Sequence, residues 1–438
     1  MSTFVATSSP RNLPYSIVSF SMFVYVNLWI LEGAIRKWVT GTESLFYVLR
    51  DLLTIAVILL LLPAIRIRRS AVSILVLVVL VVGFGAAQLL LTDGKTSVAI
   101  VGLRSYIAPT LFVVLAVGFA SRMTLNRALR IVLYYAPVQA VLCIIQVLSP
   151  MNSWFNRQVG VDEASFVNFG VVRVSGSFSA PAGLTLFVVA ALVIALISLN
   201  ADEERGGRLW AQVAVASALI IAGVSGSRGT LLAVAIIGVA YVAFTRPRTG
   251  SPSLVRWIRV AAVTGAAVAV LAVAFPAVVE SFTRRFETAA YGEDSGTRIV
   301  EQTFGFLSVP LTFLGTGMGA NSQAGIGAGS NQPWSEVEGD RWVLELGILG
   351  FIANLVRIGI CLILVIAPIV DRRLRTPSIV LLSAGLVPVL AFGQITQTPS
   401  TQGFVSIFCA AWVFSYMSAR DNTGDVAINA NQRERVLL

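Results

Sequence analysis

The 438-residue sequence contains no histidine and few charged residues. Asp, Glu, Lys and Arg make up 12% of the chain, against about 25% in soluble domains. Without histidine, a histidine base, a Ser-His-Asp triad and a histidine metal ligand are all excluded. The three cysteines, Cys143, Cys361 and Cys409, lie inside apolar runs, as buried thiols do, and indicate neither a disulfide framework nor a metal cluster. DxD-type, HExxH and Walker A motifs are also absent, so we predict no metal site and no cofactor.

Apolar residues dominate the sequence instead. Hydrophobic residues make up 56% of the chain, and the mean hydropathy is +0.82. At about 20 residues per crossing, twelve segments are candidates to span a membrane: 14–31, 45–63, 71–91, 99–119, 131–149, 180–198, 209–224, 229–245, 258–279, 345–369, 377–394 and 403–418. We therefore expect an all-α polytopic membrane protein. Residues 1–418 are expected to form one integral membrane domain, and 419–438 a disordered cytoplasmic tail.

The basic residues are distributed unevenly between the two sides of this predicted topology. With the N-terminus inside, the inner loops and both tails carry 19 of the 32 basic residues and 7 of the 22 acidic ones. The inner side then has a net charge of +12 and the outer side of −2. The positive-inside rule thus favours an N-in, C-in arrangement with one long outer loop at 280–344. This arrangement also explains the net charge of +10 without a nucleic-acid partner.

Arginines recur where the even-numbered spans begin, at the outer face. They are Arg50, Arg104, Arg173, Arg228 and Arg341. A cation at a helix N-terminus is disfavoured by at least a few tenths of a kcal/mol, and arginine near hydrocarbon costs about 2.5–3.5 kcal/mol. A bound phosphate or diphosphate would offset both costs, because guanidinium groups and free backbone N–H groups are the donors such anions need. The alternative is that each arginine reaches lipid phosphates or pairs with a nearby acid.

The long outer loop contains three kinds of sequence. Residues 281–303 are charged and include Arg298, and residues 315–332 are rich in glycine, as in a flexible loop or a mobile lid. After them come Glu336, Glu338 and Asp340, directly before Arg341. Carboxylates beside arginines suit a general base next to an anion site. A solvated acidic loop is the alternative interpretation.

Several of these segments together resemble the O-antigen polymerase/ligase superfamily. They are RVSGSFSAPAGL (173–184), SGSRGTLLAV (225–234), the stretch from Arg298 to Gly319 and ELGILGF (345–351), in this order. EGAIRKW (32–38) is similar to the exopolysaccharide-polymerase branch. The resemblance implies a metal-independent glycosyltransferase of the bacterial inner membrane. Such an enzyme moves a glycan from a polyprenyl-diphosphate donor to an acceptor sugar hydroxyl at the periplasmic face. Implied partners are the lipid-linked oligosaccharide, membrane lipids and polysaccharide export or chain-length proteins.

The resemblance also implies roles for individual residues. Arg173 and Arg228 match the two functional arginines of the family and would bind the diphosphate, assisted by Arg104 and Arg298. The ligases of the family use a histidine in the long outer loop, which this chain lacks. Glu338, close to that position, is then the predicted base. The other candidate site residues are Glu336, Asp340, Arg341 and Glu32.

Two other functions fit the sequence less well. One is a different class of polyprenyl-phosphate glycosyltransferase, in which an acid just after the first helix is catalytic, as Glu32 would be. The other is a flippase or transporter of lipid-linked glycans. A flippase should carry charges through the middle of its spans, and here mid-span charge is nearly limited to Arg357. The choice between polymerase and ligase, the sugar and the linkage stay open.

Overall fold

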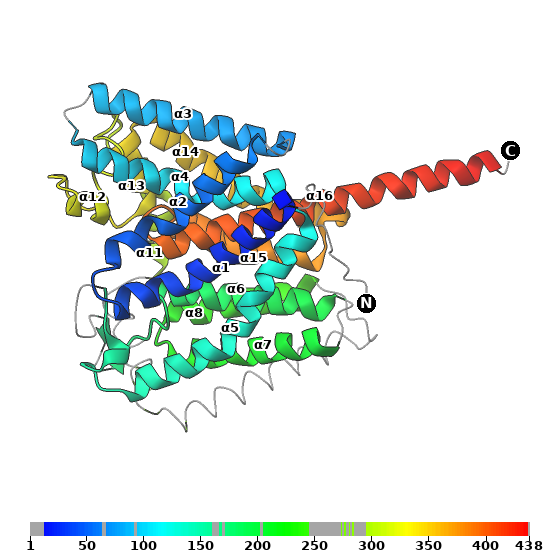
Figure 1. Cartoon of the computed structure of the whole chain (residues 1–438), viewed down its shortest axis with the longest axis horizontal. Helices are drawn as coiled ribbons and strands as arrows, with labels where there is room; N and C mark the ends of the chain where they lie inside the picture. Colours follow the sequence, from blue (N-terminus) through cyan, green and yellow to red (C-terminus); the bar gives the residue numbers. More distant parts are fainter. Residues whose placement is uncertain are drawn as a thin grey trace, which may run out of the picture.

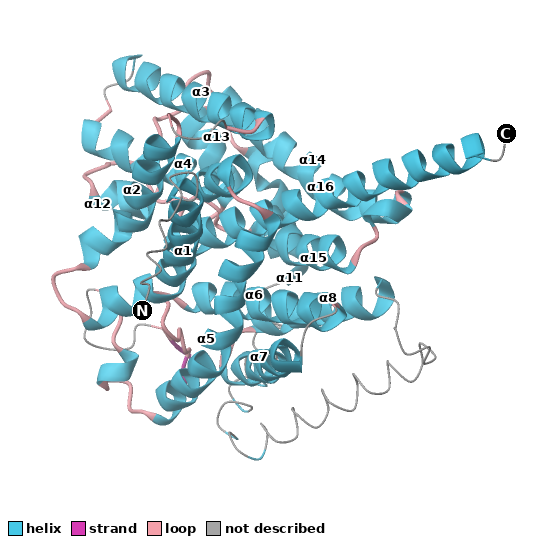
Figure 2. Ribbon diagram, turned by 45° about the vertical axis from the view of Figure 1, so that its right-hand side comes forward, coloured by secondary structure: helices cyan, strands magenta, loops and turns pink. Residues whose placement is uncertain are grey.

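The protein is a bundle of long helices that lie side by side (Figures 1 and 2). This computed structural model describes residues 13–63, 67–91, 94–159, 166–168, 171–201, 205–244 and 295–436, with four isolated positions between 245 and 294. The long helices are α1 (Leu13–Trp38), α2 (Glu43–Leu61), α3 (Arg69–Leu91), α4 (Thr96–Phe119), α5 (Arg122–Leu148), α6 (Pro181–Asn200), α7 (Arg205–Val224), α8 (Arg228–Phe244), α14 (Ile348–Val370), α15 (Pro377–Phe392) and α16 (Pro399–Val436).

The connections between these helices contain only short elements. They are η1 (Trp154–Asn156), the antiparallel pair β1 (Val167–Asn168) and β2 (Val171–Val172), α11 (Ser295–Phe304), η2 (Gly305–Ser308), α12 (Gln323–Gly327), α13 (Glu338–Leu346) and η3 (Arg372–Leu374). All of them except η3 lie at the end of the bundle where α2, α4, α6, α8, α14 and α16 begin, which we call the site end (left in Figure 1). The elaborated loops therefore gather at one end of the molecule.

The helices confirm an all-α polytopic membrane protein. In the described ranges, nine helices are long and apolar enough to cross a membrane, and α8 and α15 are shorter apolar helices. Together they correspond to eleven of the twelve expected spans, while the ninth, 258–279, lies outside the described residues. The count of twelve therefore stays a prediction.

Several helices extend beyond the expected segments, and two of these extensions bear on the predictions above. α1 continues past residue 31 to Trp38, so Glu32 lies within the helix and not after it. The ion pair between Arg36 and Glu32, four residues apart, places opposite charges on one helical face, where they support this extra turn. α16 runs to Val436, so the backbone over 419–436 is helical in the segment where we expected a disordered tail, and 437–438 lie outside the described residues.

Helix α6 forms the centre of the bundle. It contacts α5, α7, α8, α15 and α16, and every residue from Leu186 to Leu196 is buried. A helix that is apolar on all sides suits such a position, because none of its faces meets water. Pro181 opens it, where a missing N–H costs nothing. In contrast, α3 exposes side chains such as Leu80 and Leu90, as expected for a helix at the lipid boundary.

Candidate active site

A pocket of about 430 Å³ opens at the site end between α6, α8, α11 and α15. Polar and charged residues line its mouth: Arg173, Arg298, Gln302, Glu336, Gln394 and Thr398. Apolar side chains line its deeper part: Leu186, Val189, Ala233, Ile237, Ala384, Val389 and Phe392. Val189 and Ile237 lie eight and nine residues into their helices, which is roughly 12–14 Å from the helix ends at 1.5 Å per residue. The pocket thus joins a charged mouth to an apolar crevice.

Arg173 lines this mouth, and Arg228 is near enough to act on its charge, although Arg228 itself does not line the pocket. Burial lowers the pKa of Arg173, and the positive charge of Arg228 lowers it further. Arginine nevertheless stays protonated at neutral pH. The Nε atom of Arg173 is buried and has no hydrogen-bond partner in the described part of the chain. An anion bound beside Arg173 would relieve the repulsion that Arg173 experiences from Arg228.

A buried polar network fixes the loop that carries Arg173. The Nζ atom of Lys37 donates hydrogen bonds to the Gly176 carbonyl at 2.6 Å and to the Ser175 hydroxyl at 3.1 Å. The amide of Gln146 pairs with both backbone groups of Gly176, and the Gln139 carbonyl oxygen accepts from the Ser177 N–H at 3.0 Å. Gly176 has a φ of +56°, a conformation that suits glycine. Helices α1 and α5 therefore hold this loop in place.

Arg228 is the first residue of α8, and a tight turn sets its position. The Ser227 hydroxyl accepts from the Thr230 N–H at 3.4 Å, and the Ser225 hydroxyl accepts from the Ser227 N–H at 3.2 Å. Serine before the first helical residue is a favoured cap for the free N–H groups there. The hydroxyls of Thr185 and Thr230 are 2.6 Å apart and join α6 to α8. This contact keeps the helix that carries Arg228 next to the helix that follows Arg173.

The other side of the mouth is formed by Arg298 on α11 and Glu336. Their side chains are about half exposed and form an ion pair at 3.1 Å. The backbone carbonyl of Glu336 accepts hydrogen bonds from Gln394 and Gln397, both at 3.3 Å. The connection between α15 and α16 thus holds Glu336 at the pocket while leaving its carboxylate accessible.

Glu338 does not line this pocket. Its Oε1 atom accepts from Arg341 at 3.1 Å, from the Trp342 Nε1–H at 3.0 Å and from the Thr396 N–H at 2.8 Å, and its side chain is buried. Arg341 is fully buried between Glu338 and Glu345. Burial alone would lower the pKa of Arg341, but the two carboxylates raise it above its usual range. The predicted base therefore belongs to a buried ion-pair cluster.

Glu345 anchors the glycine-rich loop. Its carboxylate accepts from the Gly319 N–H at 2.9 Å, the Asn321 N–H at 3.0 Å and the Tyr106 hydroxyl at 2.7 Å. Gly317 and Gly319 have φ values of +104° and +83°, which other residues rarely adopt. In contrast to the flexible loop or lid expected, this segment is bound at several points to α4 and α13.

Arg104 and Glu32 belong to a separate cluster between α1, α2 and α4. Arg104 pairs with Asp51 at 2.6 Å, and Glu32 pairs with Arg36 at 3.3 Å and with Arg50 at 3.5 Å. Both predicted site residues are therefore neutralised within the protein, away from the residues that line the pocket.

Asp340 lies on the side of α13 that faces η2. A Cβ atom on Gly305 would come within 2.9 Å of its Oδ1 atom. Burial raises the pKa of Asp340, and so does the nearby charge of Glu301, while Arg357 acts in the opposite direction. Asp340 does not line the pocket at Arg173 either. Of the four acidic candidates, the structure places only Glu336 there.

Within the described ranges, no three His, Cys, Asp or Glu side chains form a cluster that could hold a metal ion. No family model matches the chain, and no curated protein matches it.

Proposed function

We propose that this protein is a membrane glycosyltransferase that builds polysaccharide from a polyprenyl-diphosphate-linked oligosaccharide. The single observation that supports this is the pocket in which Arg173 and Arg298 meet an apolar crevice between α6, α8 and α15. A polyprenyl-diphosphate donor has the same two parts, a dianionic or more highly charged head and a long apolar tail. Arginines suit the head because they bind phosphate oxygens in bidentate fashion.

In the proposed reaction, an acceptor hydroxyl oxygen forms a bond to the anomeric carbon of the donor sugar. The bond between that carbon and the phosphate oxygen breaks, and the polyprenyl diphosphate leaves with the electron pair. Arg173, Arg228 and Arg298 stabilise the charge that develops on the diphosphate. Glu336 takes the proton of the hydroxyl, because it is the carboxylate at the pocket mouth.

The same proposal assigns a side of the membrane. The site end faces the periplasm, residues 1–418 form one membrane domain, and 280–344 is the long outer loop. Both chain ends then lie in the cytoplasm of a bacterial cell, with twelve spans in the inner membrane. The excess of basic residues in the loops of the opposite end supports this orientation.

Reporter fusions test the topology. A reporter placed after Arg205, where α7 begins, is expected to be active in the cytoplasm. One placed after Ser330, in the glycine-rich loop, is expected to be active in the periplasm. The two positions lie at opposite ends of the bundle, so activity in the same compartment would contradict the orientation.

A block in the apolar crevice tests the function. Ala233 on α8 lines the crevice, and the adjacent Leu232 is 49% exposed and does not line it. Ala233→Phe is expected to slow transfer by about tenfold or more, because the phenyl ring would take up space that the apolar tail of the donor needs, and such overpacking costs about 1–3 kcal/mol. Leu232→Phe is the matched control and should leave the rate unchanged.

The measurement is chain extension by the full-length protein in lipid vesicles, with a polyprenyl-diphosphate-linked oligosaccharide as donor and EDTA in the buffer. Ala233→Phe should slow transfer by raising the KM for the donor. No transfer by the wild-type protein, or equal rates for the two variants, would overturn the proposal.

A further inference from the structure

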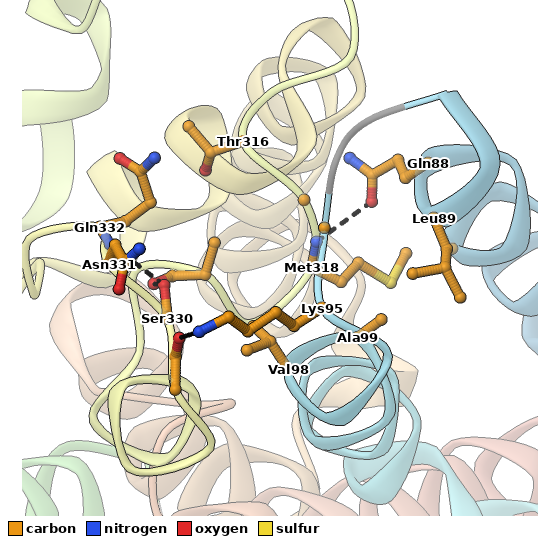
Figure 3. Close-up of a pocket in the computed structure, with 15 residues that line it drawn as sticks. Gln88, Leu89, Lys95, Val98, Ala99, Thr316, Met318, Ser330, Asn331 and Gln332 are labelled. Atoms are coloured by element: carbon orange, nitrogen blue, oxygen red, sulfur yellow. Dashed lines mark hydrogen bonds between the residues drawn. The ribbon is translucent and has the colours of Figure 1, made fainter.

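A second pocket opens at the site end, between α3, α4 and the glycine-rich loop (Figure 3). Its volume is about 280 Å³. The polar side chains that line it are Gln88, Lys95, Thr316, Ser330, Asn331 and Gln332. Among the described residues that line it, there is neither a carboxylate nor an arginine. Its chemistry is therefore that of amides, hydroxyls and one ammonium group, unlike the cationic mouth at Arg173.

Hydrogen bonds within the protein hold the walls of this pocket in place. Gln88 donates to the Glu345 carbonyl at 2.8 Å and accepts from the Met318 N–H at 3.2 Å. Lys95 donates to the Gly329 carbonyl at 2.6 Å, which ties α4 to the loop. Gly329 has a φ of +100°, so the loop conformation depends on glycine here. A preformed site loses little conformational entropy when a ligand binds.

Two of the side chains in this pocket are available to a ligand. Asn331 and Gln332 are exposed, and their amide groups have no hydrogen-bond partner in the part of the chain that the structure describes. Each amide has both a donor and an acceptor. Val98 and Met318 supply an apolar surface in the same pocket (Figure 3). Sugars present hydroxyl donors and acceptors around an apolar C–H face, which matches this combination.

We propose that this pocket binds a saccharide unit of the glycan. The inference rests on the proposed function only in taking a glycan as the substrate. The position of the pocket supports this proposal, because the loop that lines it continues directly into Glu336 at the pocket of Arg173. A hydrogen bond from the Ser335 N–H to the Asn321 carbonyl, at 3.0 Å, holds the two parts of this loop together. Asn331 and Glu336 are five residues apart in the sequence, so they are at most about 18 Å from each other. One glycan chain can therefore contact both pockets.

Glycan binding by the full-length protein in detergent tests this proposal. The probe is the oligosaccharide repeat released by mild acid from the extracellular polysaccharide of the producing cells, and the dissociation constant is measured by saturation-transfer NMR. The double variant Asn331→Ala/Gln332→Ala is expected to bind about tenfold more weakly or worse, because two hydrogen bonds to the sugar are lost. Neither side chain contributes a hydrogen bond within the described chain, so the variant should remain folded.

Ser97→Ala is the matched control. The Ser97 hydroxyl donates to the Ala328 carbonyl at 2.9 Å, which is only one of several bonds that hold the same loop, and it does not line the pocket. This variant should bind the oligosaccharide as the wild type does. Equal binding by the double variant, or no binding by the wild type, would overturn the proposal. If the wild type binds the oligosaccharide through Asn331 and Gln332 but transfers nothing in vesicles, the proposed function fails and the saccharide site stands.

Discussion

Arg228→Ala is expected to reduce chain extension by about 10³-fold or more, which is the scale of losses when a group that stabilises transition-state charge is removed. Arg228 opens α8 between Ser227 and Gly229, which both line the pocket, and its positive charge lowers the pKa of Arg173. Removing it leaves one cation fewer to oppose the charge of the leaving diphosphate. The measurement is the rate of transfer in vesicles, together with the polysaccharide chain length in cells.

Two further variants sharpen this prediction. Arg228→Lys is expected to recover little activity, because an ammonium group cannot form the bidentate pair that a guanidinium forms with phosphate. Arg127→Ala removes an exposed arginine of α5, outside the site end, and should leave extension unchanged. If Arg228→Ala extends chains at the wild-type rate while inserted normally, the anion site is wrongly placed.

Glu336→Gln is expected to lower turnover by about 10²–10⁴-fold, the usual range for loss of a general base. The protein should fold normally, since the ion pair of Glu336 with Arg298 is about half exposed and such pairs contribute little to stability. Donor binding should stay near the wild-type value. The measurement is a separation of kcat from the KM for the donor in the vesicle assay.

Glu338→Gln is the contrasting variant. Glu338 is buried against Arg341, and breaking one half of a buried ion pair leaves an uncompensated charge. Glu345 still neutralises Arg341, so the loss of stability should fall below the roughly 3–5 kcal/mol typical of an isolated buried pair. We expect lower thermal stability in detergent with turnover per folded molecule retained. The opposite pattern, a stable Glu338→Gln protein without turnover, would return the role of base to Glu338.

Much of the fold follows from hydropathy. Long apolar runs predict where helices form. Because successive spans cross the membrane in opposite directions, they also predict at which end each helix begins. Arg173 and Arg228 were therefore expected at one end of the bundle. The order of helices around the bundle is not encoded in that pattern. Arg104 and Arg341 lie on helices that also begin at the site end, yet these two arginines belong to two other clusters, against Asp51 and Glu338.

The residues that support the site are harder to predict from the sequence. Lys37 lies in the last turn of the apolar helix α1, a position typical of a cation at the membrane interface. Its ammonium group is nevertheless buried against Gly176. The sequence places Glu345 at the start of a predicted span. In the structure its carboxylate accepts hydrogen bonds from the Tyr106 hydroxyl of α4 and from two N–H groups of the glycine-rich loop. Both roles depend on contacts between residues far apart in the chain. A helical period carries no information about such contacts.

The pocket at Arg173 also has a consequence for how the protein is made. Its walls come from α6, α8, α11, α15 and the connection that leads into α16, so the pocket is complete only when the chain has been inserted as far as Thr401. Membrane helices are synthesised in order from the N-terminus. A nascent chain that has inserted α1 to α8 already contains Arg173 and Arg228 but still lacks Glu336 and the α15 wall. The enzyme that we propose would thus stay inactive in the membrane until its last helix has been inserted.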